Sequence, residues 1–212
     1  MTSGRPIDLP GLVAVLQNRA RAGRSVTAIA GPPGSGKSTL AERLAEELNR
    51  REAESAAVLP MDGSHFDDLI LVPLGWRPRK GAPHTFDVAG FAHMLSRLRA
   101  NAEPEVAVPV FDRDIEIARN SARIIPVSVR HLITEGNYLL LDQPPWTGLA
   151  PLFDTTVFLD MPMDELRRRL EIRWQGMTPE DRRRKLEEND IPNAELVLGH
   201  RGASEFVVGD AW

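Results

Sequence analysis

A glycine-rich loop between a strand-like and a helix-like segment constrains this chain more than any other feature. Residues 31–39 read GPPGSGKST and match the pattern G-x-x-x-x-G-K-[ST]. Residues 25–30 before it form a short apolar run typical of a buried strand, and leucines recur every fourth residue from Leu40 to Leu48 after it. The alternative is a turn that simply precedes a helix, but strand, loop and helix together are the setting in which this pattern binds phosphate.

The residue types of this loop indicate its chemistry. Glycines let backbone N–H groups converge on an anion at a helix N-terminus, where the helix dipole also favours negative charge. Lys37 can reach the β- and γ-phosphates of a nucleotide, and the Ser38 hydroxyl can bind Mg²⁺. We therefore expect ATP and Mg²⁺ as cofactors, with the nucleotide held by Gly31, Pro32, Pro33, Gly34, Ser35, Gly36, Lys37, Ser38 and Thr39.

The composition argues against several classes of function. A net charge of −4 gives no global attraction to nucleic acid or to an anionic membrane surface. The chain has no cysteine, and its five histidines lack metal-ligand spacing, so we expect no disulfide and no structural metal. No apolar run approaches the ~20 residues that cross a bilayer, and no signal peptide opens the chain. We expect a soluble, cytoplasmic protein without nucleic acid or membrane partners; the oligomeric state stays open, a homodimer included.

Apolar runs of strand length alternate with helical periodicities along the chain. This alternation predicts βα units and an α/β fold in which helices cover both faces of a parallel sheet. Pro109 places one of the runs at a sheet edge, because proline cannot donate a backbone hydrogen bond. Besides residues 25–30, we expect strands at 56–61, 106–111, 131–134 and 155–159.

Other segments predict how the domain is completed. A helix is expected over residues 88–99, whereas residues 63–83 are rich in proline and glycine and predict a long functional loop. Residues 164–188 are helical in pattern and dense in arginine, which suggests a small helical lid on a single domain spanning residues 1–212. Residues 1–6 are expected to be frayed.

Two carboxylates follow predicted strands, at the edge where ligands of open parallel sheets bind. Asp62 can take a proton from an attacking hydroxyl, although Asp-Gly is also a common turn pair. Glu135 can bind Mg²⁺ directly or through water; a polar strand end is the alternative. We predict Asp62 as a catalytic base, and Glu135 together with Ser38 as the magnesium ligands.

Arginines gather in the predicted lid. Arg169 and Arg173 are four residues apart and share one helix face. Two guanidinium groups on a closing helix suit the charge of a transferring phosphoryl group, and closure expels competing water. Arginine runs are more often solvated helix faces, and we expect Arg182–Arg184 to be exposed, with Asp181 and Lys185 as a surface pair.

Several motifs make the chain resemble the phosphoribulokinase, uridine kinase and pantothenate kinase group of P-loop kinases over most of its length. Residues 61–66, MDGSHF, resemble the group's D-G-F-H type motif, whose aspartate acts as the base. Residues 80–87, KGAPHTFD, are similar to the K-G-F-P-E-S-Y-D of bacterial pantothenate kinases, and residues 133–136 to the hydrophobic-E-G segment. Residues 168–173 resemble the lid stretch whose last arginine contacts phosphate, and residues 193–203 the C-terminal N-L-x-x-N-I-L-P-T-R-x-R-A segment.

The resemblance implies a P-loop NTPase fold and an ATP-dependent kinase that phosphorylates a hydroxyl of a small metabolite. Together with the chemistry above, it predicts catalytic roles for Lys37, Asp62, Arg169 and Arg173. Aromatic residues fill cores more often than pockets, but several lie in the segments expected to meet the acceptor. The predicted acceptor-binding residues are His65, Arg79, Phe86, Phe111, Arg113, Tyr138 and Asn193.

Departures from the group's motifs bear on the acceptor. Gly81 stands where uridine kinases carry an aspartate that holds ribose, and Glu116 where they carry a nucleoside-contacting histidine. Arg113 stands at a histidine position of pantothenate kinases. The combination of R-K-G-A-P-x-T-F-D, F-D-R with E-x-A-R-N, and E-G-N-Y-L-L-L-D is most similar to bacterial proteins described as fructose transport system kinases or nucleoside/nucleotide kinase family proteins. A sugar such as fructose is one expected acceptor, pantothenate or a uridine-type nucleoside is the alternative, and a nucleotide-dependent switch is the rival from another class.

Overall fold

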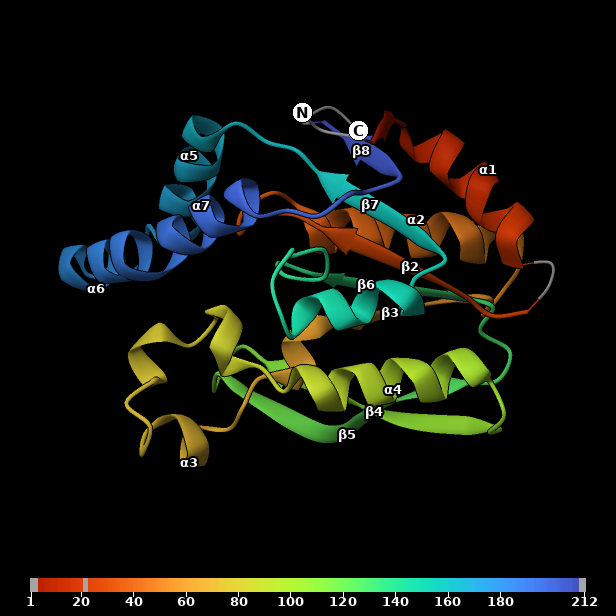
Figure 1. Ribbon diagram of the computed structural model, residues 1–212, viewed down its shortest axis with the longest axis horizontal. Helices are drawn as coiled ribbons and strands as arrows, with labels where there is room; N and C mark the ends of the chain where they lie inside the picture. The colour runs from red at the N-terminus through yellow and green to blue at the C-terminus, as the bar shows by residue number, and fades with distance from the viewer. Residues whose placement is uncertain (1–3, 21–22, 210–212) are drawn as a thin grey trace.

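A six-stranded parallel sheet forms the centre of the computed structural model, which describes residues 4–20 and 23–209 (Figure 1). Every pairing within this sheet is parallel, so the carboxyl ends of its strands meet at one edge. In spatial order the strands are β1 (Arg5–Pro6), β8 (Phe206–Val208), β7 (Thr155–Leu159), β2 (Ser25–Ala30), β6 (His131–Gly136) and β3 (Ala56–Pro60).

Helices cover both faces of this sheet (Figure 1). Strands β2 and β6 are buried along their whole length, as expected for continuous apolar strands in a covered parallel sheet. Their side chains alternate between two cores: Ile29 packs with helices α1 (Leu9–Arg19) and α2 (Lys37–Arg51), whereas Ala28 packs in the core that includes helix α4 (Val88–Ala100). The predicted α/β class, with a parallel sheet covered on both faces, is confirmed.

A separate two-stranded sheet holds the segment predicted as an edge strand. Strand β4 (Glu105–Asp112) pairs antiparallel with β5 (Ile117–Pro126) and does not join the central sheet. The predicted strand is therefore present and lies at a sheet edge, since each strand of a two-stranded sheet is an edge strand, but it is not part of the central sheet. The pairing register shifts between Val108 and Val110, where Pro109 has no N–H to donate.

The long loop predicted at residues 63–83 is a series of short helical turns. They are η2 (Met61–Ser64), α3 (Asp68–Leu71), η3 (Arg77–Arg79) and η4 (Pro83–Thr85). The N-terminal end of the chain also differs from expectation: Arg5 and Pro6 form strand β1 beside β8, while residues 1–3 lie outside the described part.

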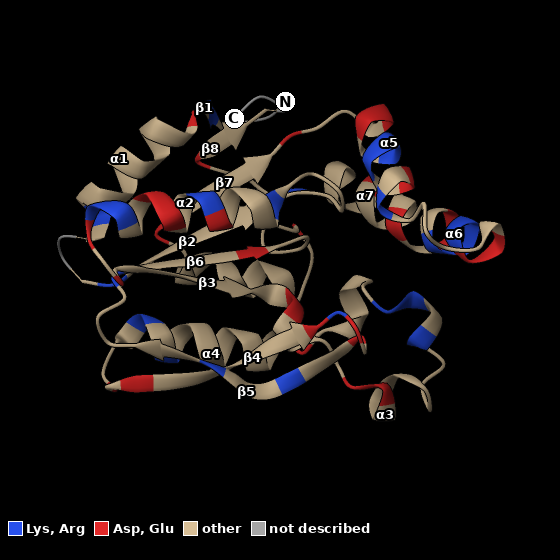
Figure 2. Cartoon of the chain, turned by 180° about the vertical axis from the view of Figure 1, so that it is seen from behind, with Lys and Arg blue, Asp and Glu red and all other residues tan. Residues whose placement is uncertain are grey.

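The arginine-rich helical segment stands at one end of the molecule, which we call the helical arm (residues 163–199). It comprises α5 (Met163–Arg173), α6 (Pro179–Lys185), the π turn η6 (Leu186–Asp190) and α7 (Ile191–Gly199). The helices therefore continue to Gly199, beyond the predicted end at residue 188. Figure 2 shows charged residues along α5 and α6, and both views place these helices at the same end as α3.

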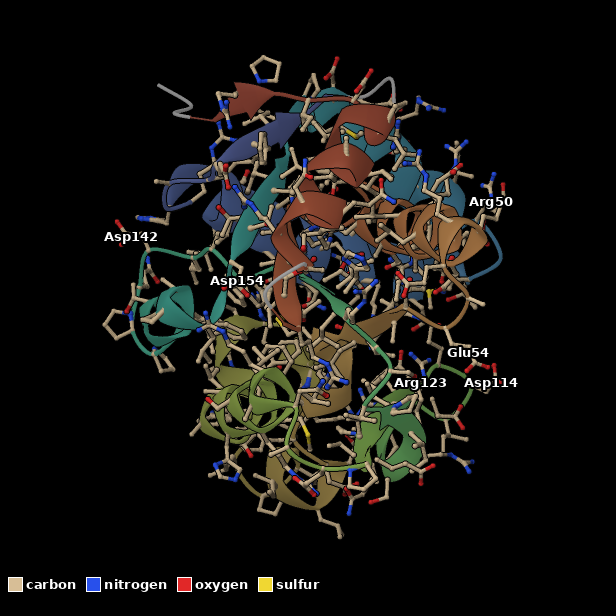
Figure 3. All side chains as sticks on the ribbon, turned by 90° about the vertical axis from the view of Figure 1, so that its right-hand side faces the viewer. Arg50, Glu54, Asp114, Arg123, Asp142 and Asp154 are labelled. Atoms are coloured by element: carbon tan, nitrogen blue, oxygen red, sulfur yellow. The ribbon has the colours of Figure 1, made fainter. Side chains whose placement is uncertain are left out.

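The opposite end of the molecule is held by backbone and side-chain hydrogen bonds. Asp154, labelled in Figure 3, accepts hydrogen bonds from the Val26 N–H at 2.8 Å and from Arg99 Nη2 at 2.6 Å. These contacts tie β2 and α4 to the segment that precedes β7. Across residues 4–20 and 23–209, no helix combines the length and hydrophobicity that a bilayer crossing requires.

Candidate active site

The glycine-rich loop leaves β2 at its carboxyl end and turns directly into helix α2. Gly34 (φ 81°) and Gly36 (φ 95°) adopt the left-handed backbone that favours glycine. A β-carbon on Gly34 would lie 3.1 Å from Leu170 Cγ, so the loop also approaches the helical arm closely. Helix α2 begins at Lys37 and is 15 residues long, so its N-terminal N–H groups and dipole face the loop. This local structure forms an anion-binding site.

The strand order places the two predicted carboxylates beside this loop. Strand β6 lies between β2 and β3, and Glu135 is in register with Ile29 on one side and Pro60 on the other. Ser38 Oγ donates a hydrogen bond to Glu135 Oε1 at 3.1 Å. Asp62 follows β3, in the turn η2. The structure thus brings together the two residues predicted to bind Mg²⁺, with Asp62 at the end of the next strand.

Burial shifts the proton affinities of the charged groups at this edge. Lys37 is 7% exposed, and Lys37 Nζ donates a hydrogen bond to the Pro32 carbonyl at 3.0 Å. Its burial lowers the pKa of Lys37 to about 8, while Glu135 and Asp62 oppose that shift. Burial raises the pKa of Glu135, and Lys37 opposes this. A phosphate group beside Lys37 would favour the charged ammonium.

One cleft of about 470 Å³ joins the phosphate-binding loop to the residues predicted for the acceptor. It opens between the carboxyl edge of the sheet, the turns of residues 61–86, the tip of the β4–β5 hairpin and the helical arm. The predicted residues that line it are Pro33, Gly34, Gly36, Lys37, Ser38, Thr39, Asp62, His65, Phe86, Phe111, Arg113, Glu135, Arg169, Arg173 and Asn193.

The acceptor half of this cleft combines an ion pair with aromatic rings. Asp62 Oδ2 accepts a hydrogen bond from Arg113 Nη2 at 3.0 Å. His65 Nδ1 lies 2.8 Å from the Asp62 carbonyl oxygen, and burial lowers the pKa of His65. The His65 ring centroid lies 3.9 Å from that of Phe86 and 4.7 Å from that of Phe111. A small polar molecule in this half would meet charged, polar and flat apolar groups together.

Two residues predicted to contact the acceptor are not among the residues that line the cleft. Tyr138 is fully buried, and its hydroxyl donates to the Gly81 carbonyl at 2.6 Å. Arg79 donates to the Glu188 carbonyl and, at 3.3 Å, to Asn193 Oδ1. Tyr138 therefore supports the backbone of residues 80–87, which we call the acceptor segment, whereas Arg79 bonds to the helical arm. Neither residue lines the cleft. Local sequence cannot distinguish these positions, because the partners are distant in the chain.

Gly31, Pro32 and Ser35 of the predicted nucleotide loop also lie outside the cleft lining. Ser35 is fully buried, and a β-carbon on Gly31 would lie 2.9 Å from Ser35 Oγ. These residues form the inner side of the loop. They support the backbone whose outer side lines the cleft.

The helical arm contributes cations to the other wall. Arg169 and Arg173 both line the cleft; Arg169 Nε donates to Glu165 Oε1 at 2.7 Å, and the Arg173 guanidinium carbon lies 4.8 Å from the Trp174 ring centroid. Trp174 Nε1 donates to Asp190 Oδ2 at 2.7 Å. The arginines predicted to face the phosphates are therefore on the wall next to the loop.

The predicted surface pair of Asp181 and Lys185 does not form, which corrects that expectation. Asp181 Oδ2 accepts a hydrogen bond from Thr178 Oγ1 at 2.7 Å, and Thr178 caps the helix by accepting from the Asp181 N–H at 3.2 Å. Lys185 instead lines the cleft, and its Nζ lies 3.7 Å from Glu116 Oε1 at the hairpin tip. The other lining residues that the sequence analysis did not assign are Lys80, Gly81, Gly136, Asn137, Trp174, Asn189 and Asp190.

Three features of this site are typical of enzymes that transfer a phosphoryl group from a nucleotide. They are a phosphate-binding loop with a buried lysine, a hydrogen-bonded Ser–Glu pair at a helix start, and an aspartate at the end of the next strand.

Comparisons with known proteins agree with this class. No family model matches the chain. YggC of Escherichia coli K12, an uncharacterized protein, is 35% identical over 201 residues, which cover 93% of this chain and 82% of YggC. The proposed uridine kinase of Schizosaccharomyces pombe is 33% identical over 183 residues, which cover 82% and 78% of the two chains. The crystal structure of the proposed fructose transport system kinase of Silicibacter sp. TM1040 has a TM-score of 0.86 and 37% identity, covering 95% and 98%.

The chain belongs to the phosphoribulokinase, uridine kinase and pantothenate kinase group of P-loop kinases. It is a phosphotransferase that uses ATP and acts on a hydroxyl of a small molecule. The family predicted from the motifs is confirmed, and so is the P-loop NTPase fold.

Proposed function

We propose that this kinase transfers the γ-phosphate of ATP to a hydroxyl of a small polar metabolite such as a sugar, with Mg²⁺ as cofactor. One observation carries the proposal: Asp62 lines the same cleft as Lys37, Ser38 and Glu135, at the end of the strand next to Glu135. A hydroxyl bound beside Asp62 and a terminal phosphate bound beside Lys37 would share this cleft.

In the proposed reaction, Asp62 accepts the proton of the acceptor hydroxyl as its oxygen attacks the γ-phosphorus. The bond between the γ-phosphorus and the bridging oxygen breaks, and ADP leaves. Lys37 and the N-terminal amides of helix α2 hold the phosphates, and Ser38 and Glu135 would bind the Mg²⁺. Bound there, Mg²⁺ would neutralise charge that develops on the phosphate oxygens.

The helical arm acts in this proposal as the lid of a single domain. Arg169 and Arg173 stabilise the charge on the transferring group, and closure excludes the water that competes with the acceptor. Arg169 exchanges its bond to Glu165 for one to phosphate. Positioning and electrostatics supply most of the catalysis in phosphoryl transfer, so these placements support the assignment.

The test is ADP release measured with a panel of sugars, polyols, nucleosides and pantothenate. Strong stimulation by one compound supports a kinase, whereas acceptor-independent hydrolysis supports the rival nucleotide switch. Asp62→Asn should then lower kcat about 100-fold or more, because it removes the base without changing the shape of the side chain. Asp112→Asn is the matched control: both carboxylates are 25% exposed and each pairs with an arginine. Near-normal turnover of Asp62→Asn would remove Asp62 from the role of base.

A further inference from the structure

We infer that the acceptor is an uncharged polyhydroxyl compound, free of phosphate and carboxylate, and that His65 selects it by accepting a hydrogen bond from one of its hydroxyls. This inference rests on the proposed function and deepens it. It names the substrate class of the same cleft and one residue that determines specificity.

The positive charges in the acceptor half of the cleft are paired with carboxylates. Each cation there already has a carboxylate beside it: Arg113 has Asp62 at 3.0 Å, and Lys80 has Asp68 at 2.6 Å. Lys185 lies 3.7 Å from Glu116. An anionic acceptor would have to compete with these carboxylates and would lie against them, which costs free energy in a partly desolvated site.

The nucleotide half differs in this respect. Lys37 donates to a backbone carbonyl, and Arg173 stacks on Trp174. Within residues 4–20 and 23–209, no carboxylate oxygen lies within 4.0 Å of the Arg173 guanidinium. Lys37 and Arg173 are therefore the cations that remain for the phosphates of ATP, and Arg169 can join them only by leaving Glu165, which is 2.7 Å away. The cations that face the acceptor are matched by carboxylates.

The contacts of the His65 ring show which of its nitrogens carries the proton. Its Nδ1 lies 2.8 Å from the Asp62 carbonyl oxygen, and a carbonyl can only accept, so Nδ1 carries the proton. Burial lowers the pKa of His65, which keeps the ring neutral at physiological pH. Nε2 then carries a lone pair that accepts a hydrogen bond from a hydroxyl and repels the oxygens of a phosphate or carboxylate.

Two aromatic rings form the wall of the cleft around His65. The ring packs against Phe86 and Phe111, with centroid distances of 3.9 Å and 4.7 Å, which gives a flat apolar surface for the C–H face of a sugar. Asn137 lines the same cleft, and its amide can donate to and accept from hydroxyl groups. This combination of apolar wall, acceptors and amide suits several hydroxyls on one carbon skeleton.

The experiment compares kcat/KM for matched pairs of acceptors that differ in charge. The pairs are fructose and fructose 6-phosphate, glucose and glucose 6-phosphate, and glycerol and glycerate. We expect the uncharged member of the pair that reacts best to be preferred at least about tenfold. Preference for the charged member would overturn the inference. ADP release that no acceptor stimulates would instead overturn the proposed function, and this inference with it.

Two variants test the residues. His65→Phe keeps the ring stack but removes the acceptor nitrogen, and should lower kcat/KM for the preferred acceptor about tenfold or more while the Kd for ATP stays unchanged. The control is His93→Phe, because His93 is exposed.

Glu116→Gln leaves Lys185 without its carboxylate and should raise the relative kcat/KM for the phosphorylated acceptor several-fold. Glu103→Gln, which breaks a surface pair with Arg97, should not change it. Unchanged acceptor preference in both cleft variants would contradict the roles assigned to His65 and Glu116.

Discussion

Ser38 Oγ and Glu135 Oε1 are joined by a 3.1 Å hydrogen bond that links the first turn of helix α2 to the carboxyl end of strand β6. Glu135 is 5% exposed, and the register of β2 with β6 brings its carboxylate to the helix start. A hydroxyl and a carboxylate held together beside a phosphate-binding loop are oxygen ligands of the kind that Mg²⁺ prefers.

Glu135→Gln should therefore raise the Mg²⁺ concentration needed for half-maximal activity about 10- to 100-fold. The amide keeps the shape of the side chain and a hydrogen bond to Ser38, but it loses the negative charge that attracts the ion. The measurement is a Mg²⁺ titration at fixed ATP, with Glu103→Gln as a surface control. An unchanged Mg²⁺ requirement would exclude Glu135 from the metal site.

The pH dependence of ATP binding should report on Lys37. Burial lowers the pKa of Lys37 to about 8, so the free enzyme loses this positive charge as the pH rises through that value. ATP binding needs the ammonium, and its affinity should fall about tenfold between pH 7 and pH 9. Titration of the nucleotide at each pH measures this. Lys37→Arg stays charged over the whole range and should give a flat profile, although a weaker one.

The acid side of the activity profile should report on Glu135. Burial raises its pKa, so the carboxylate is present above the raised pKa and is lost as the pH falls through it. Activity should fall at that pH because the proton competes with Mg²⁺ for the carboxylate. Raising the Mg²⁺ concentration should move the acid limb of kcat/KM to lower pH. An acid limb that does not respond to Mg²⁺ would assign the titration to another group.

The sequence predicted the strand, loop and helix around residues 31–39 because local pattern determines them. A buried strand, a glycine loop and an amphipathic helix are contiguous in the chain, and the strand ends at Asp62 and Glu135 follow from apolar runs. The parallel sheet then brings those ends to one edge without further information. No comparable rule exists for the acceptor half, which is built from segments far apart in the chain.

The missed elements show the physical reasons. Strand β5 is exposed along most of its length, so it lacks the alternation that identifies a half-buried strand. Positive φ angles also occur just before it, at Glu116, and within it, at Ser121. Strand β8 has only three residues. Lys185 pairs with Glu116 across the cleft, whereas a helical spacing rule favours a neighbour four residues away. Tertiary packing overrode the local pattern in each case.

Arg173 should contribute to catalysis while the arginines of α6 should not. Arg173 lines the cleft and has an aromatic ring as its neighbour, whereas the half-buried Arg182 of α6 does not line it. Arg173→Ala should lower kcat about 100- to 1000-fold with a smaller effect on the Kd for ATP, because the guanidinium acts on charge that develops during transfer. Arg182→Ala is the control and should retain normal turnover. Equal turnover of both variants would show that the helical arm does not supply this charge.

The helical arm and the acceptor segment should also be coupled, because hydrogen bonds join them. Asn189 Nδ2 donates to the Lys80 carbonyl at 3.0 Å, and Asn193 Nδ2 donates to Asn189 Oδ1 at 3.2 Å and to the Gly81 carbonyl at 3.4 Å. Through these bonds the segment of Lys80 and Gly81 holds the arm beside the cleft. Loss of the link should let the arm move independently of the acceptor and admit water.

Asn189→Ala should therefore increase the ratio of ATP hydrolysed to acceptor phosphorylated. It should also lower the free energy of unfolding by about 1–3 kcal/mol, because a buried carbonyl loses its donor. Asn49→Ala separates the two effects: Asn49 bonds the backbone of Ala56 at 2.8 Å and 3.0 Å, far from the cleft, and its loss should cost stability without changing the ratio. The measurements are ADP and phosphorylated product quantified in the same reaction, and denaturant unfolding. If both variants change the ratio equally, the hydrolysis reflects lower stability, and the link between arm and acceptor segment has no role in excluding water.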